Sequence, residues 1–450
     1  MPHDKPSFPF GTHPFLSEER HLAEYIHEDY HKFKMEQNQK VHGWFLFGKP
    51  ALNINDVELL KQIQVKDFDH FVDRNESNTS RALGRGGKLD RVGRISDPCQ
   101  LIFFFQLWGI QMANAVGEQW KDIRSTFTPI FTSGKMKAML RFLLETTRAL
   151  TGEFQRKANA GEEFQLKETF GKFSLDALAS CAFAMDAQSF EDKNSVFVKH
   201  SARIFLNTRM DNFLMFLRFM PGVPKLQELL NINTFKPKPT KFLSDVVSHA
   251  LQVRRESGER RNDMIDLMLD CIKEGEREGG GENETDEIDQ IEIDMKLQHE
   301  RKHASRITED EIIATAMVFL VAGYDTTGMT LAYLAYEMSI NPELQERLHQ
   351  EVDQAFEDND GEMPDYLTIQ NLPYIDMLIH ETLRFHTPVG FNTRNCTEDY
   401  SLPGTSVSLK KNDLVTYSIS GIHMDPTHYS HPDQFYPEHF SKEEKARRHP

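Results

Sequence analysis

The chain has 450 residues, 39% of them hydrophobic, so it is long enough to bury a sizeable core. Lys plus Arg number 52 and Asp plus Glu number 69, and the resulting formal charge of −17 argues against nucleic acid as the main partner. No CxxC pair occurs among Cys99, Cys181, Cys271 and Cys396, which predicts a reduced compartment without disulfides or a zinc site. No run reaches the roughly 18 apolar residues of a membrane span, and residues 1–10 contain no anchor.

The first 300 residues are expected to form a short β part followed by helices. Apolar runs around Gly48 and Pro50 predict a hairpin over residues 44–55. Helical patterns follow at 56–64, 120–130, 135–159, 166–186, 192–217 and 240–273. Residues 274–300 are acidic and contain glycines, which predicts a disordered linker inside one domain of residues 1–450.

Residues 307–341 carry a complete set of helix signals. Thr308 and Glu311 have the spacing of a capping box, and Ile307 and Ile312 occupy the two staple positions. Pro342 then opens a new helix. The pattern predicts a helix over residues 309–340, and its all-round apolar part at 312–322 predicts that the helix runs through the protein interior.

Polar and small residues interrupt this apolar helix at Gly323, Asp325, Thr326 and Thr327. Glycine costs roughly 1 kcal/mol of helix stability relative to alanine, and buried polar groups cost more unless they are satisfied. One interpretation is a kinked core helix whose threonines bond back to the preceding turn. The other is that Gly323 lets a flat group lie against the backbone while Asp325 and Thr326 pass protons to it.

The last part of the chain combines helices, short strands and an irregular segment. Helices are expected to about residue 356 and at 373–386, and strands at 406–409 and 414–419 are expected to pair. Glu381 and Arg384 are i, i+3 neighbours on a helix with a buried face, where such a pair fixes geometry. Four side chains of the irregular segment offer a metallohydrolase hypothesis, although their spacing matches no usual ligand pattern; they are His423, Asp425, His428 and His431.

Five motifs in order resemble the cytochromes P450, the haem-thiolate monooxygenases, in the animal branch that metabolises drugs and toxins. They are WKDIR at Trp120, AGYDTT at Ala322, ETLR at Glu381, TRNC at Thr393 and HMDPTHYSHPDQFYPEHF at His423. Each motif is weak alone, but five in this order are specific. The resemblance implies a mainly α fold with a small β part and a haem b cofactor.

The resemblance also assigns roles to individual residues. Asp325 and Thr326 would deliver protons to dioxygen bound at the haem iron, beside the small residues Ala322 and Gly323. Haem-propionate contacts would come from Trp120, Arg124 and Arg394. Glu381, Arg384 and His439 would hold the irregular segment, although the family has arginine where this chain has His439. The substrate pocket would be lined by Val318, Val321, Val389 and Gly390.

The resemblance further implies an enzyme that inserts one oxygen atom from O2 into a lipophilic xenobiotic, steroid or fatty acid. Electrons would come from NADPH through NADPH-cytochrome P450 reductase, at the cytoplasmic face of the endoplasmic reticulum membrane. In the family the axial cysteine follows shortly after the position of Phe440, so we expect it beyond Pro450 and expect this chain alone to be inactive. A haem-free binding or regulatory protein is the alternative.

Overall fold

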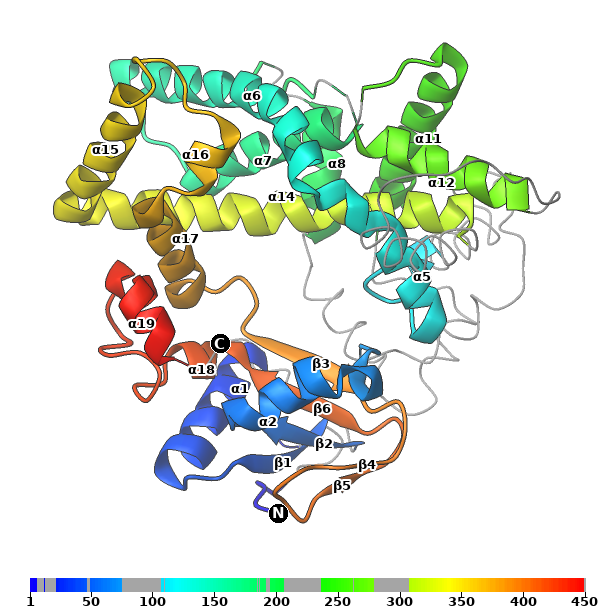
Figure 1. The fold of residues 1–450 in the computed structure, drawn as a ribbon, viewed down its shortest axis with the longest axis vertical. Coiled ribbons are helices and arrows are strands. Elements are labelled where there is room, and N and C mark those ends of the chain that lie inside the picture. The colour runs from blue at the N-terminus through cyan, green and yellow to red at the C-terminus, as the bar shows by residue number, and fades with distance from the viewer. Residues whose placement is uncertain are drawn as a thin grey trace, which may run out of the picture. The chain divides into compact units, whose positions relative to one another are not determined.

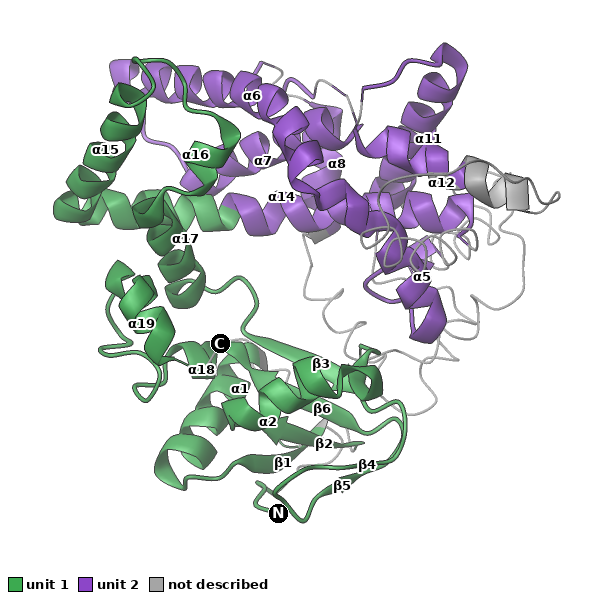
Figure 2. Ribbon diagram, in the orientation of Figure 1, with its two compact units in different colours: residues 1–75, 329–450 green, residues 76–328 purple. Residues whose placement is uncertain are grey.

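The computed structural model describes residues 1–5, 12, 22–46, 49–74, 107–108, 110–183, 185, 187–191, 195–205, 236–261, 263–278 and 307–448. Over these residues the chain is mainly α-helical with a small β part (Figure 1), which confirms the predicted fold class. It divides into two compact units, residues 1–75 with 329–450, and residues 76–328 (Figure 2). The prediction of one domain over residues 1–450 stays a prediction, and the two units are described separately.

The unit of residues 76–328 consists of helices packed around the first two thirds of one long helix, α14. The others are α5 (Gly117–Phe127), a 3-10 turn at Thr128–Phe131, α6 (Ser133–Ala160), α7 (Leu166–Phe183), α8 (Val196–Phe205), α11 (Pro237–Ser257) and α12 (Met264–Glu278). Their apolar faces share one core, in which Ile123, Leu175, Leu243 and Ile265 have no exposed side-chain surface. Burying such faces is the main source of helix stability in a protein of this kind.

Helix α14 spans Glu309–Ile340, the residues that the sequence predicts. The capping box is present, because the Thr308 N–H donates to the Glu311 carboxylate at 2.7 Å and the Glu311 N–H donates to Thr308 Oγ1 at 3.3 Å. Ile307 and Ile312 are both buried in the core. This is the one helix among the described residues that is long and apolar enough to cross a membrane, but half of the relevant window is buried and interior helices pass the same test.

Two glycines of α14 allow a close approach of α7. A Cβ on Gly323 would lie 2.7 Å from Leu178 Cδ1, and a Cβ on Gly328 would lie 3.0 Å from both the N and Cα atoms of Gly171. A side chain can move, but a backbone cannot yield without shifting its helix. Gly328 is therefore the position where the α7–α14 packing depends most on the absence of a side chain.

The other unit contains the sheet. Strands β1 (Val41–Leu46) and β2 (Lys49–Ile54) form the predicted hairpin, β2 pairs in parallel with β6 (Leu414–Ser418), and β6 pairs antiparallel with β3 (Phe391–Asn395). A second small sheet pairs β4 (Tyr400–Ser401) with β5 (Ser408–Leu409). Side chains of the two sheets share a core that includes Ile54, Cys396 and Val415.

Helices of both ends of the chain accompany these sheets. From the N-terminal part come α1 (Leu22–Tyr30), a π-helix at His31–Glu36, α2 (Val57–Lys61), a π-helix at Gln62–Lys66 and a 3-10 turn at Phe68–Phe71. From the C-terminal part come α15 (Pro342–Glu357), α16 (Tyr366–Gln370), α17 (Pro373–Phe385), α18 (Ile419–His423), a 3-10 turn at Pro437–Phe440 and α19 (Lys442–Arg447).

Three sequence-based expectations are corrected. The single helix over 240–273 is two helices, because Gly258 takes the left-handed conformation (φ +65°) that ends α11. The strand at 408–409 pairs with β4, whereas β6 finds its partners in β2 and β3. Residues 274–278 continue helix α12 and so are not part of a disordered linker, in keeping with the good helix formers Glu and Arg; residues 279–300 lie outside the described part.

We predict that Gly328→Ala lowers the free energy of unfolding by about 2 kcal/mol, because the new Cβ meets the backbone of Gly171 and α7 must shift. The matched control is Gly152→Ala on α6, where a Cβ has nothing within 4 Å and the change should stabilise the helix by about 1 kcal/mol. Urea denaturation of both variants measures the difference. Equal midpoints would show that the close approach of α7 is not needed.

Candidate active site

The centre of the proposed site lies on α14. Thr326 and Ala322 are exposed and one turn apart, and Thr326 Oγ1 donates to the Ala322 carbonyl at 2.7 Å. The hydroxyl thus bonds back to the preceding turn, as one of the two sequence interpretations has it. The residue is also exposed, as the other interpretation requires, so the two are compatible here.

Asp325 lies beside Thr326 but is engaged by another helix. Its carboxylate forms an ion pair with Lys167 Nζ of α7 at 3.3 Å, with the lysine 63% and the aspartate 31% exposed. Tyr324 is close enough for the charge of Asp325 to contribute to a raised pKa of the phenol, after the larger effect of burial. Sequence reasoning missed Lys167, since no local pattern connects residues so far apart.

The remaining predicted residues of α14 mostly face protein. Gly323 meets Leu178 of α7 at the position of its absent Cβ, so its contact in this structure is with a helix. Val321 is buried in the core, and Val318 is partly buried and packs against the same core. Whether these residues also line a substrate pocket stays a prediction.

Trp120 and Arg124 lie one turn apart on α5, in the same unit as Asp325 and Thr326. The Trp120 ring is partly buried against the apolar core, and the Arg124 side chain is exposed. The i, i+4 spacing places both on one face of the helix. The third predicted propionate contact, Arg394, belongs to the other unit.

Arg394 is a buried guanidinium with incomplete hydrogen bonding. It is 9% exposed, its Nη1 donates to the Val72 carbonyl at 3.4 Å, and its Nε atom has no partner among the described residues. Burial, followed by the nearby charge of Arg74, lowers the pKa of Arg394. A buried cation with an unsatisfied donor and a second guanidinium nearby favours binding of an anion.

Glu381 and Arg384 form a fully buried ion pair at the end of α17. Arg384 Nε and Nη2 donate to the two Glu381 oxygens at 2.8 and 2.7 Å. The other three N–H groups of Arg384 donate to backbone carbonyls at 2.8–2.9 Å, those of His423, Pro432 and Gln434. All five guanidinium donors therefore have an oxygen acceptor, and three of these acceptors lie in the irregular segment of residues 423–439.

His439 completes this cluster in place of the family's arginine. Its Nδ1 lies 3.2 and 3.3 Å from the Glu381 oxygens, and its Nε2 contacts the Ser430 carbonyl. Both neighbours are acceptors, so the ring connects Glu381 to the backbone of the irregular segment. Burial alone would raise the pKa of Glu381, but the hydrogen bonds from Arg384, His439 and the Tyr436 N–H outweigh it, so the pKa is lowered.

The irregular segment gives the metallohydrolase hypothesis no support. The described residues contain no group of three His, Cys, Asp or Glu side chains that could hold a metal ion. His423 Nδ1 donates to the Arg384 carbonyl at 3.2 Å, and Asp425 accepts from the Tyr30 hydroxyl at 2.8 Å and from Thr427. The Tyr30–Asp425 bond, which joins α1 to this segment, is another contact that sequence reasoning missed.

The predicted pocket residues after α17 are Val389, which is 49% exposed, and Gly390. A Cβ on Gly390 would lie 2.8 Å from Ala23 Cβ, so this glycine allows α1 to approach. Both belong to the unit of residues 329–450 and their proposed contact with substrate stays a prediction.

The two cysteines whose side chains are described are not poised as thiolates. Burial raises the pKa of Cys181 to about 11. Cys396 has no exposed surface, donates from Sγ to the Glu398 carbonyl at 2.8 Å, and also has a pKa raised to about 11 by burial. Cys396 is thus a core residue, in agreement with its interpretation from the sequence.

We predict that Arg384→Lys lowers the free energy of unfolding by about 3 kcal/mol, because an ammonium has three donors for five buried acceptors. The matched control is Arg347→Lys, which alters a half-exposed arginine paired with Glu438 and should cost about 0.5 kcal/mol. Denaturation midpoints of the two variants measure the contrast. A similar loss in both would mean that the buried hydrogen bonds of Arg384 are not what holds the segment.

We also predict an acid-dependent loss of stability through His423. Burial lowers the pKa of His423 to about 4, so between pH 6.5 and pH 4 the unfolded chain binds a proton that the folded chain does not. Stability is therefore complete above pH 6.5 and falls by roughly 3 kcal/mol toward pH 4 from this residue. His423→Asn keeps a donor for the Arg384 carbonyl and should flatten the profile by that amount. Parallel unfolding profiles of the two proteins over this pH range would rule the effect out.

Comparison with known proteins identifies the family. A family model described as Cytochrome P450 matches residues 103–450. Cytochrome P450 6k1 of Blattella germanica is 30% identical over 407 residues, 90% of this chain and 71% of that protein. Cytochrome P450 9e2 of the same organism is 31% identical over 451 residues, 96% and 76% of the two chains. Cytochrome P450 6B2 of Helicoverpa armigera is 30% identical over 418 residues, 93% and 73%. All are animal proteins, as predicted, and the chain belongs to the cytochrome P450 family of monooxygenases.

Proposed function

We propose that this monooxygenase inserts one oxygen atom from O2 into a lipophilic substrate, a xenobiotic, a steroid or a fatty acid, and that Asp325 and Thr326 deliver the protons. Membership of the family implies haem iron, a redox partner, dioxygen and a lipophilic substrate. We further propose that the electrons come from NADPH through NADPH-cytochrome P450 reductase at the endoplasmic reticulum membrane.

The surroundings of Arg394 fit one end of a haem group. Its buried Nε donor lacks a partner among the described residues, and Arg74 adds a second positive charge. A carboxylate such as a haem propionate would satisfy the donor and relieve the cost of burying the cation. We propose Arg394 as a propionate contact on this basis. Trp120 and Arg124, which offer an indole and a guanidinium donor from one face of α5, are proposed as the others.

Neither of the two described cysteines is suited to be the thiolate ligand of a haem iron. A thiolate ligand needs a lowered pKa, whereas the thiols of Cys181 and Cys396 have pKa values raised to about 11. We therefore propose no ligand to the iron from among these residues. When bound, haem supplies the iron at which dioxygen is activated.

Thr326 and Asp325 are suited to hold and move protons on α14. The exposed Thr326 hydroxyl donates to the Ala322 carbonyl at rest. To relay a proton it would turn its O–H from this carbonyl toward the reactant and give up that proton, while Oγ1 takes one from the acid side. Asp325, paired with Lys167, is partly exposed and so remains in contact with water. We propose that solvent protons reach Thr326 through Asp325. The exposed Ala322 leaves room for a reactant beside this hydroxyl.

A redox partner with an acidic surface would find positive charge on the unit of residues 76–328. Lys121 on α5 is exposed and Lys137 on α6 is exposed, and Lys135 lies between them in sequence. Complementary charge accelerates the encounter of two proteins. We propose these lysines as part of the reductase-binding face.

For the substrate, the apolar side chains of Val318, Val321 and Val389 and the small Gly390 support a preference for lipophilic molecules.

The observation that carries this proposal is the exposed Thr326 one turn from the exposed Ala322, in the middle of helix α14. The test compares Thr326→Val, which removes only the hydroxyl, with Thr327→Val, which makes the same change at the next exposed threonine. In protein that holds haem and is supplied with reductase, Thr326→Val should release at least about tenfold more hydrogen peroxide per NADPH consumed, because protons are no longer delivered to the oxygen at the required step. Thr327→Val should behave like the unchanged protein.

Haem binding, followed separately by absorption, should be the same for both variants. If both variants release the same amount of peroxide, the proton-delivery role of Thr326 is wrong.

A further inference from the structure

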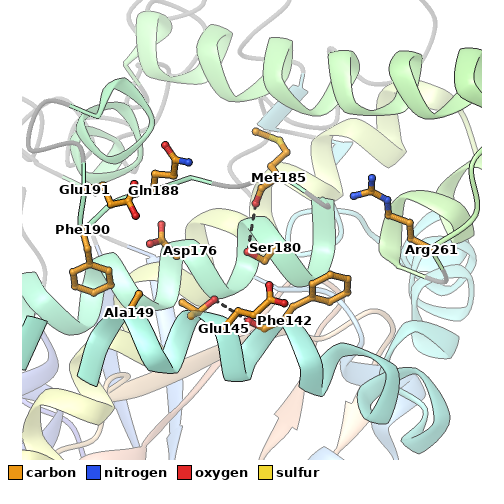
Figure 3. Close-up of a pocket in the computed structure, with 11 residues that line it drawn as sticks. Phe142, Glu145, Ala149, Asp176, Ser180, Met185, Gln188, Phe190, Glu191 and Arg261 are labelled. Carbon is orange, nitrogen blue, oxygen red and sulfur yellow. Dashed lines mark hydrogen bonds between the residues drawn. The ribbon is translucent and has the colours of Figure 1, made fainter. Parts of the chain in front are cut away.

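A cavity of about 320 Å³ lies in the helical unit, away from the residues of α14 described above. Its walls are one face of α6, which includes Phe142 and Glu145, the side of α7 that carries Asp176, residues 185 and 187–191, and Arg261 from the connection between α11 and α12 (Figure 3). The volume is in the range of sites that bind small molecules. Its four wall segments all belong to the unit of residues 76–328.

The lining is acidic. Glu145, Asp176 and Glu191 contribute three carboxylates, against the single positive charge of Arg261. Asp176 is buried and accepts from the N–H and hydroxyl of Ser189. Glu145 and Glu191 are exposed, and no cationic side chain of the described residues pairs with either. The formal charge of the lining is therefore −2, and two of its carboxylates remain available.

Arg261 does not neutralise these two carboxylates. Its guanidinium is occupied by Glu259, with Nε–Oε1 and Nη2–Oε2 distances of 2.9 and 3.2 Å. Figure 3 shows Arg261 at the opposite side of the cavity from Glu191, with Glu145 between them. The negative potential is thus concentrated along α6 and residues 187–191.

Aromatic side chains accompany the available carboxylates. Phe142 lies next to Glu145, and Phe190 lies next to Glu191, as Figure 3 shows. The Arg141 guanidinium already lies over the Phe142 ring, 4.5 Å from its centroid, so Phe142 contributes apolar contact with its remaining surface. An aromatic ring attracts a cation through its negative face, and its apolar surface also buries methyl or methylene groups. Carboxylates combined with aromatic rings in one cavity are the lining that an organic cation requires, whereas an inorganic cation would need converging oxygen ligands, and no such group occurs in the described residues.

We propose that this cavity binds a small organic monocation, a quaternary or protonated amine with an apolar body, with Glu145 and Glu191 supplying the charge and Phe142 and Phe190 the apolar contacts. The site is separate from the proposed oxidation site, since none of its lining residues belongs to α14. Its function is binding alone. Failure of the proposed monooxygenase reaction would leave it unaffected.

The test uses the full chain and two probes of nearly equal shape, choline and its neutral carbon isostere 3,3-dimethylbutan-1-ol, with dissociation constants measured by NMR titration. Choline should bind at least about tenfold more tightly than the neutral alcohol. Glu145→Gln and Glu191→Gln should each weaken choline binding by about threefold, and the double variant by about tenfold. Raising the salt concentration to 0.5 M should weaken it further, because the carboxylates are exposed.

Two further variants separate binding in the cavity from general attraction to an acidic protein. Glu163→Gln removes the same charge from an exposed residue of the same unit outside the cavity and should leave choline affinity unchanged. Ala149→Phe, at an exposed helix position in the cavity wall, should fill the space and abolish binding. Equal affinity for the two probes, or equal effects of Glu145→Gln and Glu163→Gln, would overturn the proposal.

Discussion

The five hydrogen bonds of the Arg384 guanidinium fix the part of the chain that has least regular structure of its own. Residues 423–439 start at the last residue of α18 and otherwise contain only most of the 3-10 turn at Pro437–Phe440, so few repeating backbone bonds define their path. Arg384 supplies the missing constraints by donating to three of their carbonyl groups, and Glu381 balances the charge. Burying such a pair costs several kcal/mol, which is recovered only when every donor and acceptor is satisfied. The segment must therefore adopt the backbone path that places its carbonyl groups at the Arg384 donors.

His439 shows how the same requirement is met with a different side chain. A histidine offers two donors where arginine offers five, yet here one nitrogen faces Glu381 and the other faces the Ser430 carbonyl. Compared by side-chain type alone, this substitution would weaken the cluster. The ring reaches across the cluster because the 3-10 turn at Pro437–Phe440 buries it beside α17. The cluster remains satisfied, with fewer hydrogen bonds from its third member.

Elements determined by interactions between residues close in sequence were mostly predicted correctly, whereas elements determined by long-range contacts were not. Helix α14 begins and ends at the predicted residues because its capping box, staple residues and following proline are all local. The strand β6 was assigned the wrong partner, since its pairing with β2 depends on contacts across more than half of the chain. The break at Gly258 carried a local signal, a glycine after a helical stretch, but the helical periodicity on both sides of it obscured the end of α11.

The candidate site divides in the same way. The sequence placed Ala322, Asp325 and Thr326 on one stretch of helix, because helical spacing is local. It did not reveal that Asp325 pairs with Lys167, that the Nε of Arg394 lacks a partner among the described residues, or that side chains of α6 and α7 help to line an acidic cavity. Each of these depends on contacts between segments that are distant in sequence, and a single sequence does not indicate which distant segments come into contact.

The small residues of α14 serve two different purposes on neighbouring faces. Gly323 and Gly328 are directed at α7, where their missing side chains let the two helices approach, whereas Ala322 and Thr326 are exposed. The close approach also has a chemical consequence, because it is α7 that carries Lys167 to within 3.3 Å of Asp325. A wider separation of the helices would lengthen this ion pair and leave the carboxylate to water alone. The position of the acid proposed to supply protons therefore depends on glycines that never contact the reaction themselves.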